Sequence, residues 1–216
     1  MAGFTGRTSS LIKYNDRSIR NLTTTPAAAG GDTGALVHIK TLTASGDSTL
    51  NFVNGASGVV LDDTYPIYKI EYINLHPSND GDYFRINFSI DTGSNYNVEK
   101  TTTHFYAYHN EGDASGFAYD TSSDITGTGD ATIAPSVGND NDQAFSGSMF
   151  LFNPSSTTFV KHFISTINEA HSDNHTVQTN NAGYINSTSA VDAIKFVYTS
   201  GTIDSGKIKL YGIKDA

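Results

Sequence analysis

Apolar and polar residues alternate along most of this chain, as they do in β-strands that bury one face. Turn-forming residues, chiefly Gly, Asn, Asp and Ser, interrupt the alternation at short intervals. No segment shows the periodicity of a helix. The pattern predicts about ten strands, over residues 35–42, 48–53, 67–75, 83–90, 101–109, 149–152, 158–165, 175–181, 193–198 and 207–213.

The strand predicted over residues 83–90 shows the alternation most clearly. Arg85, Asn87 and Ser89 face one way, toward water or a second subunit, and four apolar residues face the other way. These apolar residues are Phe84, Ile86, Phe88 and Ile90. Such strands favour two antiparallel sheets, each with one buried face, over a parallel sheet. We therefore expect an all-β fold, an antiparallel β-sandwich.

The two ends of the alternating pattern suggest how the chain is organised. Residues 1–33 have no sustained period and close with Pro26 and a small-residue run, so we expect an extended N-terminal arm that ends in a hinge. Residues 34–216 are expected to form one domain. Within it, residues 110–146 are rich in Gly, Asp, Asn, Ser and Thr, and we expect a long functional loop region there.

Charge is distributed unevenly over these parts. The net charge of −9 argues against nucleic acid as the main partner. The arm is nevertheless basic, and we expect it to lie on a partner surface and to contact it through Arg7, Lys13, Arg17 and Arg20. Residues 101–160 contain no Lys or Arg but several acids. A basic arm thus precedes an acidic body.

Several classes of protein are disfavoured by what the sequence lacks. There is no Cys, so disulfides, thiolate metal sites and cysteine nucleophiles are excluded. No apolar run approaches the roughly 20 residues of a membrane helix, and the first residues do not resemble a signal peptide. No nucleophile elbow, zinc-protease motif or Rossmann glycine pattern occurs. We therefore expect a protein that is not an enzyme and that has no membrane partner.

Aromatic residues beside the acidic segment are the candidates for an exposed contact. A tyrosine combines an apolar ring with a polar tip, which suits both sugars and protein interfaces. The predicted loop contacts are Tyr106, Tyr108, Phe117 and Tyr119.

Histidines and acids raise the question of a metal. His171 and His175 would share a face if their segment were a strand, but the polar residues around them favour two exposed histidines in a loop. Residues 111–113 and 139–142 offer oxygen ligands for structural calcium. Their spacing matches no EF-hand, and Asp and Asn are also the usual turn formers. We expect no cofactor, with calcium as the alternative that the residues leave open.

Two blocks of the sequence, about 66–94 and 147–214, resemble structural proteins of tailed bacteriophages, especially marine ones. The first block carries Tyr68-Lys69-Ile70-Glu71-Tyr72 and Arg85-Ile86-Asn87-Phe88-Ser89-Ile90-Asp91. The second carries Phe152-Asn153-Pro154-Ser155-Ser156 and Gly206-Lys207-Ile208-Lys209-Leu210-Tyr211-Gly212. The resemblance implies a sandwich of jelly-roll or lectin-like type on a virion, in head decoration proteins or in tail and fibre proteins.

These observations lead to one expected function and two alternatives. We expect a capsid decoration or cement protein, made in the host cytoplasm, that forms a homo-oligomer, in particular a homotrimer, and binds the major capsid protein or other virion proteins. The first alternative is a receptor-binding module of a tail fibre or head fibre that recognises host surface glycan through residues 110–146. The second is a carbohydrate-active enzyme on the same sandwich, for which no catalytic group is visible.

Overall fold

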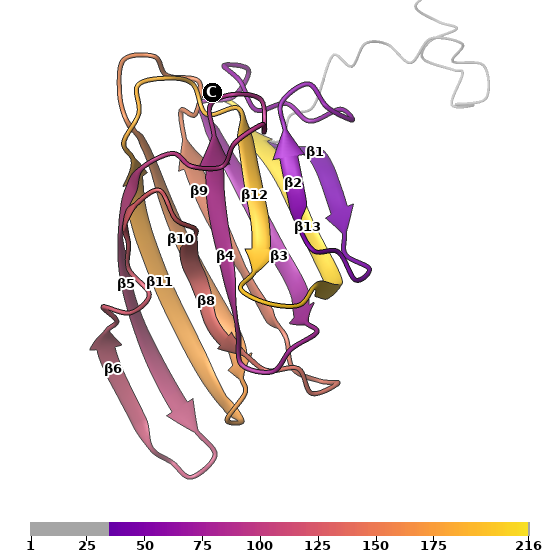
Figure 1. Ribbon diagram of the computed structural model, residues 1–216, viewed down its shortest axis with the longest axis vertical. Coiled ribbons are helices and arrows are strands. Elements are labelled where there is room, and N and C mark those ends of the chain that lie inside the picture. Colours follow the sequence, from indigo (N-terminus) through magenta and orange to yellow (C-terminus); the bar gives the residue numbers. More distant parts are fainter. Residues whose placement is uncertain (1–34, 216) are drawn as a thin grey trace, which may run out of the picture. The chain divides into compact units, whose positions relative to one another are not determined.

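A computed structural model describes residues 35–215, which form thirteen antiparallel strands (Figure 1). The large sheet runs in the order β1 (Leu36–Thr43), β13 (Ile203–Ile213), β3 (Ile67–Pro77), β9 (Phe145–Phe152), β10 (Lys161–His171), β11 (His175–Ile185), β5 (Lys100–Asn110) and β6 (Ser115–Tyr119). The short strand β7 (Thr126–Gly127) also pairs with β5. The small sheet runs β2 (Leu50–Val53), β12 (Ala193–Tyr198), β4 (Asp82–Ser89) and β8 (Ala131–Val137). The prediction of an all-β antiparallel sandwich is confirmed.

The sandwich has the strand order of a jelly roll. Strands β1, β3, β9 and β13 lie in the large sheet, and strands β2, β4, β8 and β12 lie opposite them in the small sheet. The chain thereby crosses between the sheets as two interlocked Greek keys require. Two insertions, β5–β7 and β10–β11, extend the large sheet beyond β9. One residue pair, His171 with Val137, joins β10 to β8, so the sheet nearly closes on itself.

Aromatic rings fill the space between the two sheets. Phe84 is fully buried, and its ring centroid lies 4.8 Å from that of Phe145 and 5.1 Å from that of Tyr198. Tyr72 and Phe196 complete the cluster. Because burial of each large apolar side chain contributes about 1.5–3 kcal/mol, this cluster stabilises the packing of the two sheets.

All ten strands predicted from the alternation are present, but residues 110–146 are not the long loop that we expected. They contain β6, β7 and β8. The alternation did not predict β8, because this strand contains Pro135 and small residues and only two of its buried side chains, Ile133 and Val137, are large and apolar. It did not predict β6, because five residues are too few to show a period.

The outward face of β4 also differs from the prediction. Asn87 does not face water: it is buried, and its side-chain amide donates to the Thr128 carbonyl (3.1 Å) and the Asp130 carboxylate (2.7 Å). The segment around these two residues therefore covers the strand. Ile90 is 40% exposed, because the strand ends at Ser89 before the alternation does.

The large sheet is wider than the small one, so part of its inner face extends past β8. The side chains of Thr179 and Asn181 on β11 both donate to the Ile133 carbonyl of β8, at 2.8 and 3.1 Å. At this level the sheets are joined. Farther along β8, its pairing with β4 shifts register between Phe84 and Asp82, and Ser136 in this irregular part has a φ of 53°, in the left-handed region. Beside this bulge, side chains on the inner face of β11 and β5 line an open groove.

Candidate functional site

The open part of the inner face forms a groove whose floor is set by the alternation of β5 and its pairing with β6. Tyr106 pairs with Ala118, and Tyr108 pairs with Gly116. Both partners are small. A β-carbon on Gly116 would lie only 2.6 Å from the Tyr108 ring, so the glycine provides the space in which this ring lies against the strand.

Four rings follow one another along this floor. The centroids of Tyr106 and Tyr108 are 6.4 Å apart, and those of Tyr108 and His175 are 5.7 Å apart. His175 in turn stacks on His171 at 4.2 Å, with 23° between the ring planes. The two histidines are cross-strand neighbours at the end of the β10–β11 hairpin. A continuous aromatic row thus spans from β5 to β10.

Residues from three other segments complete the groove, which has a volume of about 370 Å³. Tyr83 comes from β4, and Pro135 and Ser136 come from β8. Asp120 and Ser122 follow β6. We call this site the tyrosine groove; its lining residues are Tyr83, Tyr106, Tyr108, Asp120, Ser122, Pro135, Ser136, His171, His175 and Val177. Its volume lies within the range of small-ligand sites.

The groove offers hydrogen-bonding groups beside its rings. Within residues 35–215, no protein group bonds the hydroxyls of Tyr83, Tyr106 or Tyr108. Burial alone would raise the pKa of the Asp120 carboxyl, but hydrogen bonds from the hydroxyl (2.6 Å) and N–H (2.9 Å) of Ser122 outweigh it and lower this pKa. Asp120 is therefore a charged acceptor at neutral pH.

The surroundings of His171 keep its ring uncharged. Burial lowers the pKa of His171, and the adjacent His175 ring lowers it further. At neutral pH the His171 ring is therefore a neutral, stacked aromatic group. The expectation of two exposed loop histidines is wrong, because only residues 172–174 form the turn and the two rings pack on each other across it.

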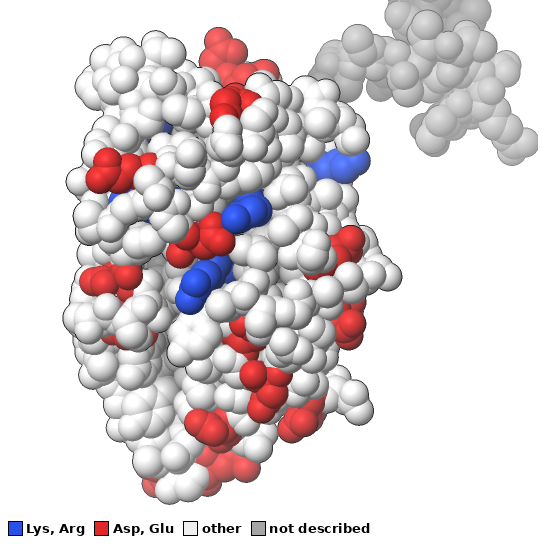
Figure 2. Space-filling view, viewed as in Figure 1, with Lys and Arg blue, Asp and Glu red and all other residues white. Residues whose placement is uncertain are grey.

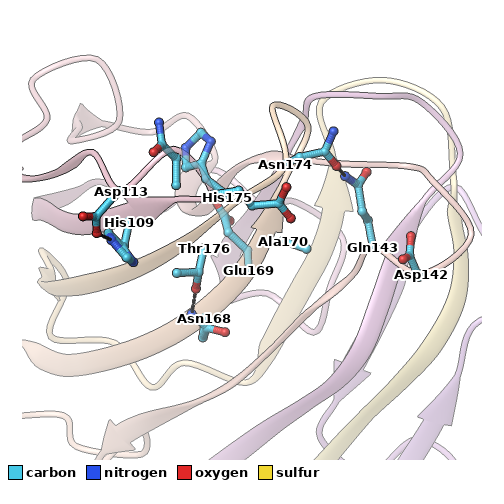
Figure 3. A pocket seen from close by; sticks show the side chains of 12 residues that line it. His109, Asp113, Asp142, Gln143, Asn168, Glu169, Ala170, Asn174, His175 and Thr176 are labelled. Carbon is cyan, nitrogen blue, oxygen red and sulfur yellow. Dashed lines mark hydrogen bonds and ion pairs between the residues drawn. The ribbon is translucent and has the colours of Figure 1, made fainter.

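A second, more polar pocket of about 640 Å³ adjoins the groove at His175 (Figure 3). The His109 ring contacts the Asp113 carboxylate at 3.1 Å on one side of this pocket. Across it, the Gln143 amide donates to the Asn174 side chain at 2.9 Å. Glu111 and Asp142 also line it, so the two acidic segments that the sequence suggested for calcium meet at one pocket.

The described residues offer no ready-made metal centre. Between residues 35 and 215, no three His, Asp or Glu side chains gather closely enough to hold a metal ion. In the same part of the chain, no helix is long and apolar enough to cross a membrane.

The predicted contact residues divide between two faces. Tyr106 and Tyr108 lie in the groove, whereas Phe117 (72% exposed) and Tyr119 (51% exposed) lie on the opposite face of the sheet, where Phe117 packs on Phe105. The four basic residues of the arm, Arg7, Lys13, Arg17 and Arg20, lie outside the described residues.

Apart from Tyr106 and Tyr108, the residues that line the groove were not predicted from the sequence to form a site. Tyr106 and Tyr108 are two apart on one predicted strand, so the alternation already placed them on a common face. The approach of Asp120 and His175 depends on the pairing of β5 with both β6 and β11, which no local signal specifies.

No family model, curated protein or solved structure matches this chain.

Proposed function

We propose that this protein is a non-enzymatic recognition module that binds saccharide in the tyrosine groove. The observation that carries the proposal is the aromatic row from Tyr106 through Tyr108 and His175 to His171, next to the charged acceptor Asp120.

A saccharide matches this combination of groups. The C–H faces of a pyranose ring are apolar and pack on aromatic rings, while its hydroxyls need hydrogen-bond partners in the same plane. Tyr106 and Tyr108 offer ring faces and hydroxyls together, and Asp120 accepts from sugar hydroxyls as a charge-assisted partner. A purely apolar ligand would leave these polar groups unpaired, at a cost of about 1–3 kcal/mol each.

The charge of the groove selects among saccharides. Asp120 is ionised, and neither Lys nor Arg occurs among the described residues that line the groove or the adjoining polar pocket. Glu111, Asp113 and Asp142 add further negative charge next to it. We therefore expect neutral or amino-bearing oligosaccharides to bind and uronates, sialylated sugars or phosphorylated sugars to be rejected.

The same groups support binding over hydrolysis. Glycoside hydrolysis ordinarily uses two carboxyl groups about 5–9.5 Å apart on either side of the scissile bond. Of the described groove residues, Asp120 alone carries a carboxylate.

We propose a virion surface as the setting, with host glycan as the ligand of a tail-fibre or head-fibre module. The setting rests on the sequence resemblance, whose two blocks coincide with β3, β4 and β9–β13. These strands form much of the framework of the sandwich, whereas Tyr106, Tyr108 and Asp120 lie outside both blocks.

Capsid decoration is the second proposal, because a shared framework is equally compatible with a protein that coats the head. Cryo-electron microscopy of purified particles separates the two: hundreds of copies on the head favour decoration, and a few copies at a tail or fibre favour recognition.

An oligosaccharide array followed by calorimetry tests the recognition proposal. The array carries neutral, amino and acidic oligosaccharides, and the best neutral or amino compound is titrated into the full chain. Tyr108→Ala is expected to weaken binding at least tenfold, or about 1.4 kcal/mol. The matched control is Tyr119→Ala, an exposed tyrosine on the opposite face of the neighbouring strand, which should bind like the unaltered protein. An array without hits, or equal binding by Tyr108→Ala, contradicts the proposal.

A further inference from the structure

The turn between β10 and β11 holds the His171 ring in one protonation state. The backbone N–H of Asp173 donates to Nδ1 of His171 at 3.1 Å. A backbone N–H can only donate, so this ring nitrogen carries a lone pair and no proton. The bond therefore forms only with a neutral ring whose single proton is on Nε2.

Asp173 also offers a partner to the charged form of the same ring. The Oδ2 atom of its carboxylate lies 3.8 Å from Nδ1 of His171, beyond hydrogen-bonding distance, and its side chain is 83% exposed. A protonated Nδ1 is a donor, which a carboxylate accepts in a charge-assisted hydrogen bond. Asp173 thus presents a donor to the neutral ring and an acceptor to the charged ring.

The turn is linked to the tyrosine groove on two sides. On one side, His171 stacks on His175 at 4.2 Å, and the His175 ring lies 5.7 Å from that of Tyr108. On the other side, the N–H of Ser172 donates to the carbonyl of Ser136 at 3.0 Å, and Ser136 lines the groove. A rearrangement of the turn therefore reaches groups on both sides of the groove.

Charged neighbours on three segments act on the His171 ring. Burial and the adjacent His175 of β11 lower the pKa of His171. Asp173 in the turn and Asp80 in the β3–β4 loop raise this pKa, but the net effect is a lowering. The ring is therefore neutral at neutral pH, and these two carboxylates attract a proton to it as the pH falls.

Other titratable residues lie on the same side of the large sheet. They are Tyr83, Tyr108 and Asp120, which line the groove, and Glu169, two residues before His171 on β10. Burial raises the pKa of Glu169, so this carboxyl carries no charge at acidic pH. On the face drawn in Figure 2, acidic side chains gather at the lower end, where the β10–β11 turn lies in Figure 1, and no Lys or Arg of the described residues is seen there. These surroundings favour uptake of a proton in acid.

We propose that the His171–Asp173 pair is a pH switch for the tyrosine groove. At neutral pH the N–H of Asp173 holds the neutral ring on His175, and the aromatic row is complete. When Nδ1 takes up a proton, the ring exchanges this N–H for the Asp173 carboxylate and leaves its stack on His175, so the row is broken at its end. The loss of saccharide affinity that follows in acid rests on the proposed function, whereas the change in the groove needs no ligand.

An NMR titration of the full chain without ligand tests the switch itself. His171 should be neutral at pH 7 with its proton on Nε2, and should be protonated in one step below the usual histidine pKa of 6.5. The ring signals of His175 and Tyr108 should shift with the same midpoint. Asp173→Asn keeps the backbone N–H but removes the carboxylate, so its midpoint should be lower.

Three results of this titration would overturn the switch. The first is a His171 ring that is already protonated at pH 7. The second is a protonation of His171 that leaves the signals of Tyr108 unchanged. The third is a midpoint that is the same in Asp173→Asn and in the unaltered protein.

Calorimetry with the saccharide that binds best extends the test to affinity. One pH unit below the midpoint, about one-tenth of the molecules keep the neutral ring, so the dissociation constant should rise about tenfold over its value at about pH 7.5. His171→Phe keeps an aromatic ring on His175 but takes up no proton, and its affinity should not change over this range. The matched control is His162→Phe, on the opposite face of β10 beside Tyr184, which should keep the tenfold change.

The two measurements separate the switch from the proposed function. Equal saccharide affinity at both pH values overturns the switch, and so does a tenfold change that persists in His171→Phe. A chain that binds no saccharide at either pH contradicts the proposed function, and the NMR titration then decides on the switch alone.

Discussion

The inner face of the large sheet has a covered region and an open region, and tyrosines occupy both. In the covered region, the Tyr68 hydroxyl donates to the Asp62 carbonyl at 3.0 Å. Tyr198, from the facing small sheet, donates its hydroxyl to the Leu75 carbonyl of the large sheet at 3.2 Å. In the open region, the hydroxyls of Tyr106 and Tyr108 find no such partner within residues 35–215. The same residue type therefore serves packing in one region and stays available to a ligand in the other.

Titration behaviour follows the same division. Burial raises the pKa of Tyr68 to about 12, and it raises the pKa of Tyr198 well above the usual value of 10.0. Burial thus favours the neutral form of these two tyrosines. Asp120, at the rim of the open region, is held in its charged form by hydrogen bonds. Polar groups between the two sheets are thus buried, whereas Asp120 and the tyrosines of the groove face open space.

The largest expected difference between the regions is in stability. Phe84→Ala, in the covered region, should lower the free energy of unfolding by about 3–5 kcal/mol, because it leaves a cavity among packed rings. Tyr106→Ala, in the open region, should lower it by less than about 1 kcal/mol. Urea denaturation of both variants measures the difference, and similar losses would abolish the distinction between the regions.

A buried carboxyl makes the stability of the sandwich depend on pH. Glu169 is buried, neither carboxyl oxygen has a partner among the described residues, and burial raises its pKa well above 4.5. The unfolded chain releases this proton near pH 4.5 while the folded protein retains it, so the folded state loses relative stability as the pH rises. Glu169→Met should therefore stabilise the protein by about 1–3 kcal/mol at pH 8 and by less at pH 4.

Denaturation at the two pH values checks this prediction. Ser165→Ala is the control, because Ser165 is another buried, unpartnered side chain on β10 that does not titrate in this range. Its effect should be equal at both pH values. An equal effect of Glu169→Met at pH 4 and pH 8 would contradict the assignment.

A buried lysine should give the opposite dependence on pH. Lys100 donates to the Gly129 carbonyl at 2.6 Å, and burial lowers its pKa from 10.5 to about 8. Between these values the unfolded chain binds more protons than the folded protein, so stability rises with pH. From pH 8 to 9.5 the gain should be about 1–2 kcal/mol.

Lys100→Met should remove this rise, whereas Lys207→Met, at an exposed position, should keep it. Denaturation midpoints across pH 8 to 9.5 provide the measurement. If stability still rises with pH in Lys100→Met, a group other than Lys100 causes the rise.

The smallest expected effect is confined to the groove. Gly116→Ala places a β-carbon against the Tyr108 ring and should displace it, so saccharide affinity falls severalfold while stability changes little. Gly112→Ala, in the adjacent hairpin turn, serves as the control, because its β-carbon would meet only the Asn110 side chain, at 3.4 Å. Calorimetry with the same oligosaccharide detects the difference. Unchanged affinity in Gly116→Ala would mean that the Tyr108 ring does not contact the ligand.

The alternation was sufficient to predict the framework of the fold and the two tyrosines of the aromatic row in the groove. It located ten strands and put Tyr106 and Tyr108 on one face. It could not locate β8, whose burial comes from the opposing sheet and not from its own composition. It also could not bring Asp120 and His175 to these tyrosines, because strand pairing between distant segments leaves no mark in a local pattern.

A crystal structure of the protein with the neutral or amino oligosaccharide that binds best would locate the saccharide directly. We expect a sugar ring packed on Tyr106 and Tyr108, with a hydroxyl bonded to the Asp120 carboxylate. A sugar bound elsewhere, with the tyrosine groove empty, would show that the groove is not the binding site.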